Sequence, residues 1–302
     1  MALESWNDGA VKSTIVDFVA RVVKQGGAEY AHPAERVAVF DNDGTLWCEQ
    51  PIQVQLFFLI DRAKELAGKD PALKERPAFR ALLEGDFGAL LANGKQGAME
   101  LLAATHAGMS EEEFEATARS WFASARHPKF GRLFNQCTYR PQVELLGYLR
   151  DNGFKTYIVS GGGVDLMRAY AEEAYGIARE QVIGSSMKLR FEIKDGRPQL
   201  MKVGELGSFD DREVKPANIG LHIGRRPLLA FGNSDGDLAM MRYTNGGSGP
   251  RLALLLHHDD DEREFAYDRE FKLSPLSEAL DKAIDYDITV VSMKRDWKVI
   301  FD

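Results

Sequence analysis

The stretch that decides the fold is 36–45, which reads RVAVFDNDGT and passes from an apolar run into Asp41, Asn42 and Asp43. The run is rich in β-branched residues and has no polar alternation, as expected for a strand covered on both faces of a sheet. Two carboxylates at positions i and i+2 after a strand project to the same side, which supplies one nucleophile and one proton donor beside a hard cation. A solvated turn rich in Asp and Asn is the alternative interpretation of this segment taken alone.

Short apolar runs recur along the chain, and most of them follow a helical stretch. Such alternation of strands and helices predicts an α/β fold with a parallel sheet. The segment at 187–203 departs from this rhythm, because a turn at Asp195-Gly196 between two strand-like runs predicts a β-hairpin. A helical period over 10–25 predicts a packing helix. The expected strands of the parallel sheet are 36–40, 155–159, 181–184, 228–231 and 251–256.

More than a hundred residues separate the first two expected strands, and they read as almost wholly helical. We expect them to form a second, helical domain at 47–140, inserted into a core made of 1–46 and 141–302. The acids Glu111, Glu112 and Glu113 follow Ser110, where they suit the first turn of a helix better than a metal site. The helices expected in the insertion are 52–67, 78–83, 97–106 and 111–126.

The composition excludes several classes of partner. The chain has 302 residues, 44% of them hydrophobic, and its 38 Lys and Arg against 46 Asp and Glu leave a formal net charge of −8. No basic stripe remains to neutralise a nucleic-acid backbone or an anionic membrane surface, so we expect a small molecule as the partner. No apolar run approaches the ~20 residues of a membrane-spanning helix.

The cysteines and the N-terminus indicate the cellular compartment in which the protein is expected. Cys48 and Cys137 provide no disulfide framework and favour a reducing environment. The N-terminus carries Glu4 and Asp8 without the basic and apolar regions of a secretory signal. We therefore expect a cytoplasmic protein.

Three further polar clusters lie near expected strand ends, where ligands bind in folds of this class. Ser160 and the glycines 161–163 offer a hydroxyl and backbone N–H groups at a helix start, which is typical of an anion site or of a tight turn only. Lys215 stands before Pro216, so its ammonium group is directed either to a phosphate or to solvent. The third cluster, 233–237, reads NSDGD, and oxygen side chains this dense are costly beside a buried strand unless a cation or phosphate compensates them.

The four clusters, in this order, resemble the haloacid dehalogenase (HAD) superfamily of phosphohydrolases. The resemblance covers about 36–256, and its layout is closest to the phosphoserine-phosphatase-like branch. It implies a Rossmann-like core, and the helical insertion is similar to the C1 cap of the superfamily. The motifs that carry it are FDNDGTLW at 40–47, IVSGGG at 158–163, EVKPAN at 213–218 and FGNSDGDLAMM at 231–241.

The resemblance also implies roles for individual residues. Asp41 would be the nucleophile that forms an aspartyl-phosphate, and Asp43 the general acid and then the general base. Ser160, the N–H of Gly161 and Lys215 would hold the phosphoryl group. Mg²⁺ would be bound by the Asp41 carboxylate, the Asp43 main-chain carbonyl and a side chain of the fourth motif, an all-oxygen site of the kind this ion prefers.

The fourth motif departs from the common pattern of the superfamily. Asn233 stands where most relatives have the first acid of the motif, and only the second acid, Asp237, is kept. We expect Asn233 to be the metal ligand through its carbonyl oxygen, and Asp237 to stand behind the metal site and orient Lys215. Asp235 is the rival ligand, since it would restore the missing negative charge.

Residues 47–50 follow the first motif, where relatives line the substrate pocket. In phosphoserine phosphatases a glutamate there receives the substrate ammonium group; its place here is taken by Gln50, and the acid lies one residue earlier, at Glu49. We therefore expect Glu49 to contact the substrate, with phosphoserine itself not secured. Segment 257–262, HHDDDE, is expected to be a solvated turn, and Phe57, Phe58 and Trp121 are expected to pack in the core of the insertion.

The expected function is Mg²⁺-dependent hydrolysis of a small phosphomonoester. A phosphotransferase or phosphomutase would share every core residue and is the first alternative. A catalytically silent phosphate-binding module is the second, although such a module has no need of both Asp41 and Asp43. Dehalogenation is disfavoured, because Asp43 supplies a proton donor that carbon–halogen displacement does not require.

Overall fold

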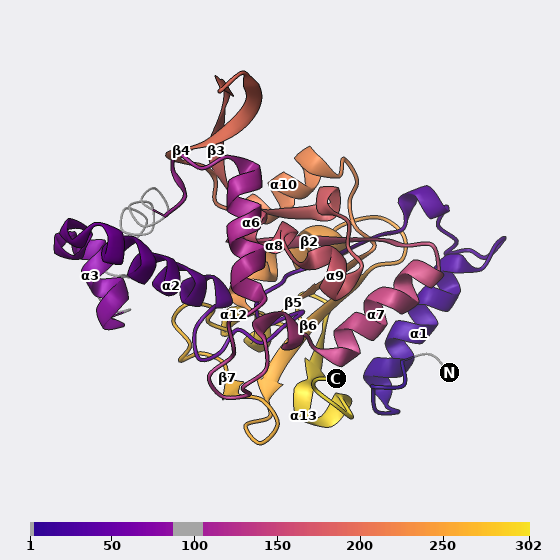
Figure 1. The fold of residues 1–302 in the computed structure, drawn as a ribbon. Helices are drawn as coiled ribbons and strands as arrows, with labels where there is room; N and C mark the ends of the chain where they lie inside the picture. Colours follow the sequence, from indigo (N-terminus) through magenta and orange to yellow (C-terminus); the bar gives the residue numbers. More distant parts are fainter. Residues whose placement is uncertain (1–2, 87–104) are drawn as a thin grey trace.

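A computed structural model of the chain describes residues 3–86 and 105–302, and Figure 1 traces their arrangement. The helix expected at 97–106 lies mostly outside these residues. A single sheet runs through the centre of the described part, with helices on both of its faces (Figure 1). Its strands are β1 (Val37–Phe40), β2 (Lys155–Gly163), β3 (Val182–Lys194), β4 (Arg197–Ser208), β5 (Leu229–Gly232), β6 (Leu252–Asp259), β7 (Ala266–Tyr267) and β8 (Ile288–Ser292).

The strand order is β4-β3-β2-β1-β5-β6-β7, with β8 also paired to β6. All neighbours from β3 to β6 pair in parallel, as does β8 with β6, whereas β4 and β7 are antiparallel to theirs. The α/β class and the parallel sheet expected from the sequence are therefore confirmed. Because β1 lies between β2 and β5, the residues that follow these three strands emerge side by side at one edge of the sheet.

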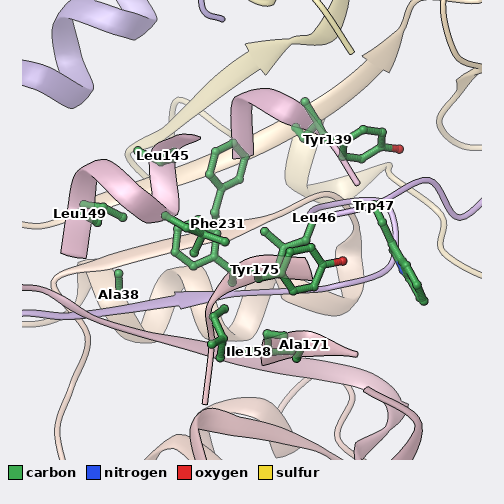
Figure 2. Packing of buried hydrophobic residues seen from close by; sticks show 14 of the residues in the cluster. Ala38, Leu46, Trp47, Tyr139, Leu145, Leu149, Ile158, Ala171, Tyr175 and Phe231 are labelled. Carbon is green, nitrogen blue, oxygen red and sulfur yellow. The ribbon is translucent and has the colours of Figure 1, made fainter. Parts of the chain in front are cut away.

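The four residues of β1 are all buried, and they alternate between two apolar layers. Ala38 and Phe40 belong to the layer that contains α1 and α7, while Val37 and Val39 belong to the layer that contains α10 and α11. A strand covered on both faces in this way explains the continuous apolar run in the sequence. Figure 2 shows the first layer, where Phe231 of β5 and Ile158 of β2 lie in the same cluster as Leu145 and Leu149 of α7.

The helices agree with the expected segments to within a few residues. Within the described residues, no helix is both long and apolar enough to cross a membrane. Their bounds are α1 (Ala10–Val23), α2 (Val54–Lys69), α3 (Pro77–Glu84), α6 (Glu111–Phe122), α7 (Arg140–Asp151), α8 (Val164–Arg168), α9 (Ala171–Tyr175), α10 (Val214–His222), α11 (Leu238–Asn245), α12 (Glu278–Asp281) and α13 (Met293–Asp296).

Helices α2, α3 and α6, here called the helical insertion, lie between β1 and α7 in the chain. Ser110 and Glu113 form a reciprocal cap at the start of α6, so the acids there serve the helix end, as expected. Phe58 and Trp121 pack edge to face with ring centroids 5.6 Å apart, which confirms their packing role. The division of the chain into two domains at 47 and 140 stays a prediction.

The expected hairpin is confirmed and is longer than 187–203. It is formed by β3 and β4, and its turn lies at Asp195 and Gly196, both with positive φ. The hairpin projects from the body of the molecule, at the top of Figure 1. Apolar side chains on its outer part are exposed, among them Phe191 at 64%.

Two expectations about strand ends are wrong. β6 continues to Asp259, and His258 is only 2% exposed, so the first half of the segment 257–262 is strand and only Asp261 and Glu262 form the exposed turn that was expected. Pairing with β8 through His257 and with β7 from His258 extends the strand beyond the apolar run. Similarly, β2 continues through Gly163 with a register shift after Ser160, so the glycines belong to an irregular strand end and not to a loop.

The close packing of β3 against the irregular end of β2 can be tested by a substitution at Gly184. A Cβ added at Gly184 of β3 would lie 2.4 Å from Cε of Met167 and 2.7 Å from the carbonyl oxygen of Gly162. Gly184→Ala should therefore lower the free energy of unfolding by about 1–3 kcal/mol, as overpacking does elsewhere. Gly147→Ala is the matched control, since nothing lies within 4 Å of its added Cβ in α7, and it should stabilise by up to about 1 kcal/mol. Urea unfolding of the two variants decides; equal effects would contradict the close packing at Gly184.

Candidate active site

Most of the predicted site residues gather at one edge of the sheet around a cavity of about 500 Å³, whereas Asn233, Glu49 and Asp235 do not line it. Asp41 and Asp43 enter it from the end of β1, and Ser160 from the end of β2. Lys215 reaches it from the first turn of α10, and Asp237 from the turn after β5. Residues far apart in the sequence therefore meet as the parallel topology predicts.

The ammonium group of Lys215 lies at the floor of this cavity, with its side chain almost fully buried. Its Nζ is 2.6 Å from Oδ1 of Asp41 and 2.6 Å from Oδ1 of Asp237, and it donates to the carbonyl oxygen of Val159 at 3.0 Å. Burial would lower the pKa of Lys215, but the two carboxylates outweigh it and raise the pKa. Lys215 is therefore a permanent cation held between two acids.

The surroundings of the Asp41 carboxyl group are more negative than Lys215 alone can balance. Burial and then the charge of Asp237 raise the pKa of Asp41 to about 8, although Lys215 acts in the opposite direction. Its Oδ1 accepts from Lys215, and among the described residues no hydrogen-bond donor is found for its Oδ2. A further cation at this carboxylate would compensate the remaining charge.

The side chain of Asp43 is held in one orientation, and its surroundings favour the protonated form. Its Oδ1 accepts a hydrogen bond from Nε1 of Trp47 at 2.8 Å. The Trp47 ring in turn stacks on Tyr170, with centroids 4.4 Å apart, so the donor is held by packing. Burial raises the pKa of Asp43 above its ordinary value, against the lowering effects of Trp47 and Lys215. A carboxyl group with a raised pKa, directed into a cavity, is suited to donate a proton.

The turn after β1 needs a glycine and is supported from behind. Gly44 has φ 72°, and a Cβ there would lie 2.1 Å from Nδ2 of Asn233. Its carbonyl oxygen is 2.7 Å from Nε2 of His258, the buried residue of β6 that the sequence analysis placed in a solvated turn. Thr45 donates from Oγ1 to Oδ1 of Asn233 at 3.0 Å. The first and fourth motifs are thus joined directly through Thr45 and Asn233.

The structure does not place Glu49 in contact with the cavity. It is fully buried, and its Oε1 accepts from Nδ2 of Asn233 and from the hydroxyl of Tyr267, both at 2.9 Å. Burial, followed by the charge of Asp43, raises its pKa well above the ordinary value. This geometry gives no support to the substrate contact expected for Glu49. The neighbour that explains its position, Tyr267, is more than two hundred residues away in the chain and could not be found from local sequence.

The hydrogen bonds of Asp235 give no support to its rival assignment as a metal ligand. Its carboxylate accepts hydrogen bonds from the backbone N–H groups of Ser277, Glu278 and Ala279 at the start of α12. Neither Asp235 nor Asn233 is among the residues that line the cavity. Asp237 does, but its Oδ2 accepts from the N–H groups of Asn233 and Ser234, while Oδ1 faces Lys215.

The second motif offers its hydroxyl and backbone groups to the same cavity. Ser160 is 1% exposed, and its Oγ accepts from the N–H of Gly162 at 3.2 Å. The carbonyl oxygen of Gly161 accepts from Oγ of Ser185 at 2.7 Å, and that hydroxyl also accepts from the N–H of Asp210. Ser185 thereby holds the Gly161 peptide in place, a role for which its sequence neighbourhood gives no signal.

The remaining walls of the cavity come from segments that the sequence analysis did not connect with the site. They include the start of α2, the base of the β3–β4 hairpin and the segment 272–275, which follows β7 in the chain. These walls combine apolar side chains with polar and charged ones. The apolar lining residues are Leu56, Leu59, Phe114, Leu166, Met187, Leu206, Phe209, Leu273 and Pro275. The polar and charged ones are Gln53, Gln55, His106, Asp165, Ser185, Ser186, Asp211, Arg212, Ser234, Lys272 and Ser274.

The donor groups around Asp41 fit a hard divalent cation. The Asp41 carboxylate, the main-chain carbonyl of Asp43 and the amide oxygen of Asn233 are all oxygen donors, as Mg²⁺ requires. Among the described residues no N–H or O–H donor is found for the Asp43 carbonyl, so it is open to a ligand. Within 3–86 and 105–302, no group of three or more His, Cys, Asp or Glu is arranged to hold a metal. A site with one carboxylate, one carbonyl and one amide does not need such a group.

Two solved structures with TM-scores above 0.5 share this fold, and a third is similar with a lower score. A conserved protein of unknown function from Anaerococcus prevotii DSM 20548 is similar with a TM-score of 0.55 and 17% identity, over 85% of this chain and 91% of that one. A protein of unknown function from Bordetella pertussis Tohama I gives 0.53 and 18%, over 85% and 98%. A phosphoserine phosphohydrolase-like protein from Francisella tularensis gives 0.43 and 18%, over 83% and 98%.

Comparison with protein families identifies the group to which these features belong. No curated protein matches the chain significantly. The family model described as haloacid dehalogenase-like hydrolase matches residues 38–242, which is more than half of the chain and includes all four motifs. The resemblance noted from the sequence is thereby confirmed: the chain belongs to the haloacid dehalogenase-like hydrolase family.

Proposed function

We propose that the protein is a Mg²⁺-dependent phosphatase that hydrolyses a small phosphomonoester through an aspartyl-phosphate. The observation that carries the proposal is the buried Lys215, held between Asp41 and Asp237 at the floor of a cavity that Asp43 and Ser160 also line. A fixed cation beside a carboxylate nucleophile is what a phosphoryl group with its negative oxygens requires.

In the first half of the reaction, a carboxylate oxygen of Asp41 attacks phosphorus and the bond from phosphorus to the leaving oxygen breaks. Asp43 donates its proton to that oxygen, so the product leaves as an alcohol. Lys215, the hydroxyl of Ser160 and the N–H of Gly161 hold the phosphoryl oxygens. In the second half, Asp43 takes a proton from water, the water oxygen attacks phosphorus, and the bond to Asp41 breaks to release phosphate.

The metal ion is assigned to the Asp41 carboxylate, the Asp43 main-chain carbonyl and the amide oxygen of Asn233. When bound, Mg²⁺ supplies positive charge to the phosphoryl oxygens and to Asp41. Asn233 contributes no negative charge, so the protein part of this site is less anionic than one built on two carboxylates.

The wall of the cavity bears on the substrate. The helical insertion supplies part of this wall, and we propose that it acts as a cap over the catalytic edge of the sheet. The cavity volume of about 500 Å³ suits a small phosphorylated metabolite. Membership in a hydrolase family favours water as the acceptor over a phosphotransferase or phosphomutase reaction, and the retained Asp41 and Asp43 argue against a silent binding module.

Asp41→Asn tests the nucleophile. The amide nearly matches the carboxylate in volume but does not attack phosphorus, so turnover should fall by at least about 10³-fold. The measurement is phosphate released from a panel of phosphomonoesters, with and without Mg²⁺. Circular dichroism and thermal unfolding serve as the control for the fold. Retention of more than about one hundredth of the wild-type rate would overturn the assignment.

Asn233 and Glu49 together test the metal assignment. In Asn233→Asp the new carboxylate would face Oε1 of Glu49, which now lies 2.9 Å from the amide nitrogen, and two acids this close do not both ionise. Mg²⁺ activation should therefore improve little. In the double variant with Glu49→Gln the neighbouring amide donates to the new carboxylate, and half-activation should need about tenfold less Mg²⁺ than in the wild type. A double variant that needs as much Mg²⁺ as the wild type would exclude position 233 as a ligand.

Asp235→Asn is the matched control for this titration. The substitution weakens the three backbone hydrogen bonds that hold the start of α12. It should lower the free energy of unfolding by about 1–2 kcal/mol while leaving the Mg²⁺ concentration for half-activation unchanged. A steep loss of Mg²⁺ activation would instead return Asp235 to the metal site.

A further inference from the structure

Gln55 links the helical insertion to the catalytic edge of the sheet. It is the second residue of α2, and its side chain lines the cavity. Its Oε1 accepts a hydrogen bond from the backbone N–H of Gly163 at 2.7 Å. A Cβ added at Gly163 would lie 3.0 Å from Nε2 of Gln55, so the whole carboxamide lies against this glycine.

The orientation of the Gln55 amide follows from this hydrogen bond. A flipped amide would set its N–H groups against the N–H of Gly163, so Oε1 must face the backbone and Nε2 must point elsewhere. Nε2 carries two N–H donors. In the part of the chain that the structure describes, no acceptor is found for them. The amide is thus fixed on its acceptor side and free on its donor side.

The position of Gln55 relative to Asp43 assigns it to one part of the substrate. A Cβ added at Gly162 would lie 3.1 Å from Oδ2 of Asp43, and the next residue, Gly163, contacts Gln55. The acid that protonates the leaving oxygen and the Gln55 amide therefore contact adjacent residues of one strand end. Gln55 stands on the leaving-group side of the cavity, whereas Lys215 stands on the phosphoryl side.

The other polar side chains that the insertion directs to the cavity have partners of their own. Gln53 donates from Nε2 to Oγ of Ser274 at 3.2 Å. His106 shares a hydrogen bond with Thr105 at 2.6 Å and stacks on Phe114. Burial lowers the pKa of His106 to about 3, so it stays neutral. Arg212 and Lys272 also line the cavity, but they come from segments outside the insertion. Gln55 lies next to Leu56 on α2, and its free donor is fixed in direction by Gly163, so it can select an acceptor at one position.

We propose that Gln55 binds the leaving group of the substrate by donating from Nε2 to an oxygen close to the ester bond. The substrate is then a phosphomonoester whose organic part carries an oxygen acceptor near the ester. This inference rests on the proposed phosphatase function. It assigns to the helical insertion a specific bond that distinguishes one alcohol from another.

A matched substrate pair tests the inference. Glycerol 3-phosphate and propyl phosphate have the same carbon chain and differ in the hydroxyl oxygens. The wild-type enzyme should favour glycerol 3-phosphate in kcat/KM, and this preference should fall about tenfold in Gln55→Met, mainly through KM. Gln55→Glu keeps the acceptor for Gly163 but removes the donor, so the preference should fall by a similar factor there. A merely structural role would leave it intact in Gln55→Glu.

Gln53→Met is the control for a disturbed attachment of the insertion. It removes the bond to Ser274 and should change kcat/KM for both substrates by the same factor. A wild-type enzyme without preference for glycerol 3-phosphate, or a preference unchanged in Gln55→Glu, would overturn the inference while 4-nitrophenyl phosphate hydrolysis still upholds the phosphatase. Failure to release phosphate from any phosphomonoester would overturn the proposed function itself.

Discussion

The contact on which the site depends is the ammonium group of Lys215 buried between Asp41 and Asp237, with both N–O distances at 2.6 Å. Each charge is costly in an apolar interior, and each is tolerable only because the others are present. The three residues come from the end of β1, the start of α10 and the turn after β5. The arrangement therefore exists only when those elements are in register. The cluster of Lys215, Asp41 and Asp237 therefore forms only in the folded sheet.

Several features at the edge of the sheet serve to keep this floor in place. Asp237 uses its second oxygen on the N–H groups of Asn233 and Ser234, which fixes the turn after β5. Gly44 brings the turn after β1 close to Asn233, and His258 supports that turn through the Gly44 carbonyl. These hydrogen bonds orient the groups before a substrate arrives, so the site needs no reorganisation during a reaction.

The parts of this structure that could be predicted from sequence are those with local signals. The apolar run 37–40 followed by acids predicted a buried strand, and the order of the motifs predicted that Lys215 and Asp41 meet at its end. The hydrogen-bond partners of Glu49, Asp235 and His258 were not predicted, because they lie in distant segments: Tyr267, the start of α12 and the Gly44 carbonyl. A polar residue next to a motif looks the same in sequence whether it faces a substrate or another buried group. Only the tertiary neighbours decide between the two.

The contacts of Asn233 give the altered fourth motif a physical interpretation. An acid at this position would lie against Glu49, which is fully buried and shares Tyr267 as a donor. The amide avoids a pair of adjacent carboxylates, because it donates from Nδ2 to Glu49 and accepts from Thr45 at its carbonyl oxygen, the oxygen proposed above to bind the metal. The exchange of an acid for an amide at 233 and the presence of an acid at 49 therefore belong together. The acid missing from the motif thus has a counterpart one layer farther from the cavity, where burial raises the pKa of Glu49 well above its ordinary value and so disfavours a second buried negative charge.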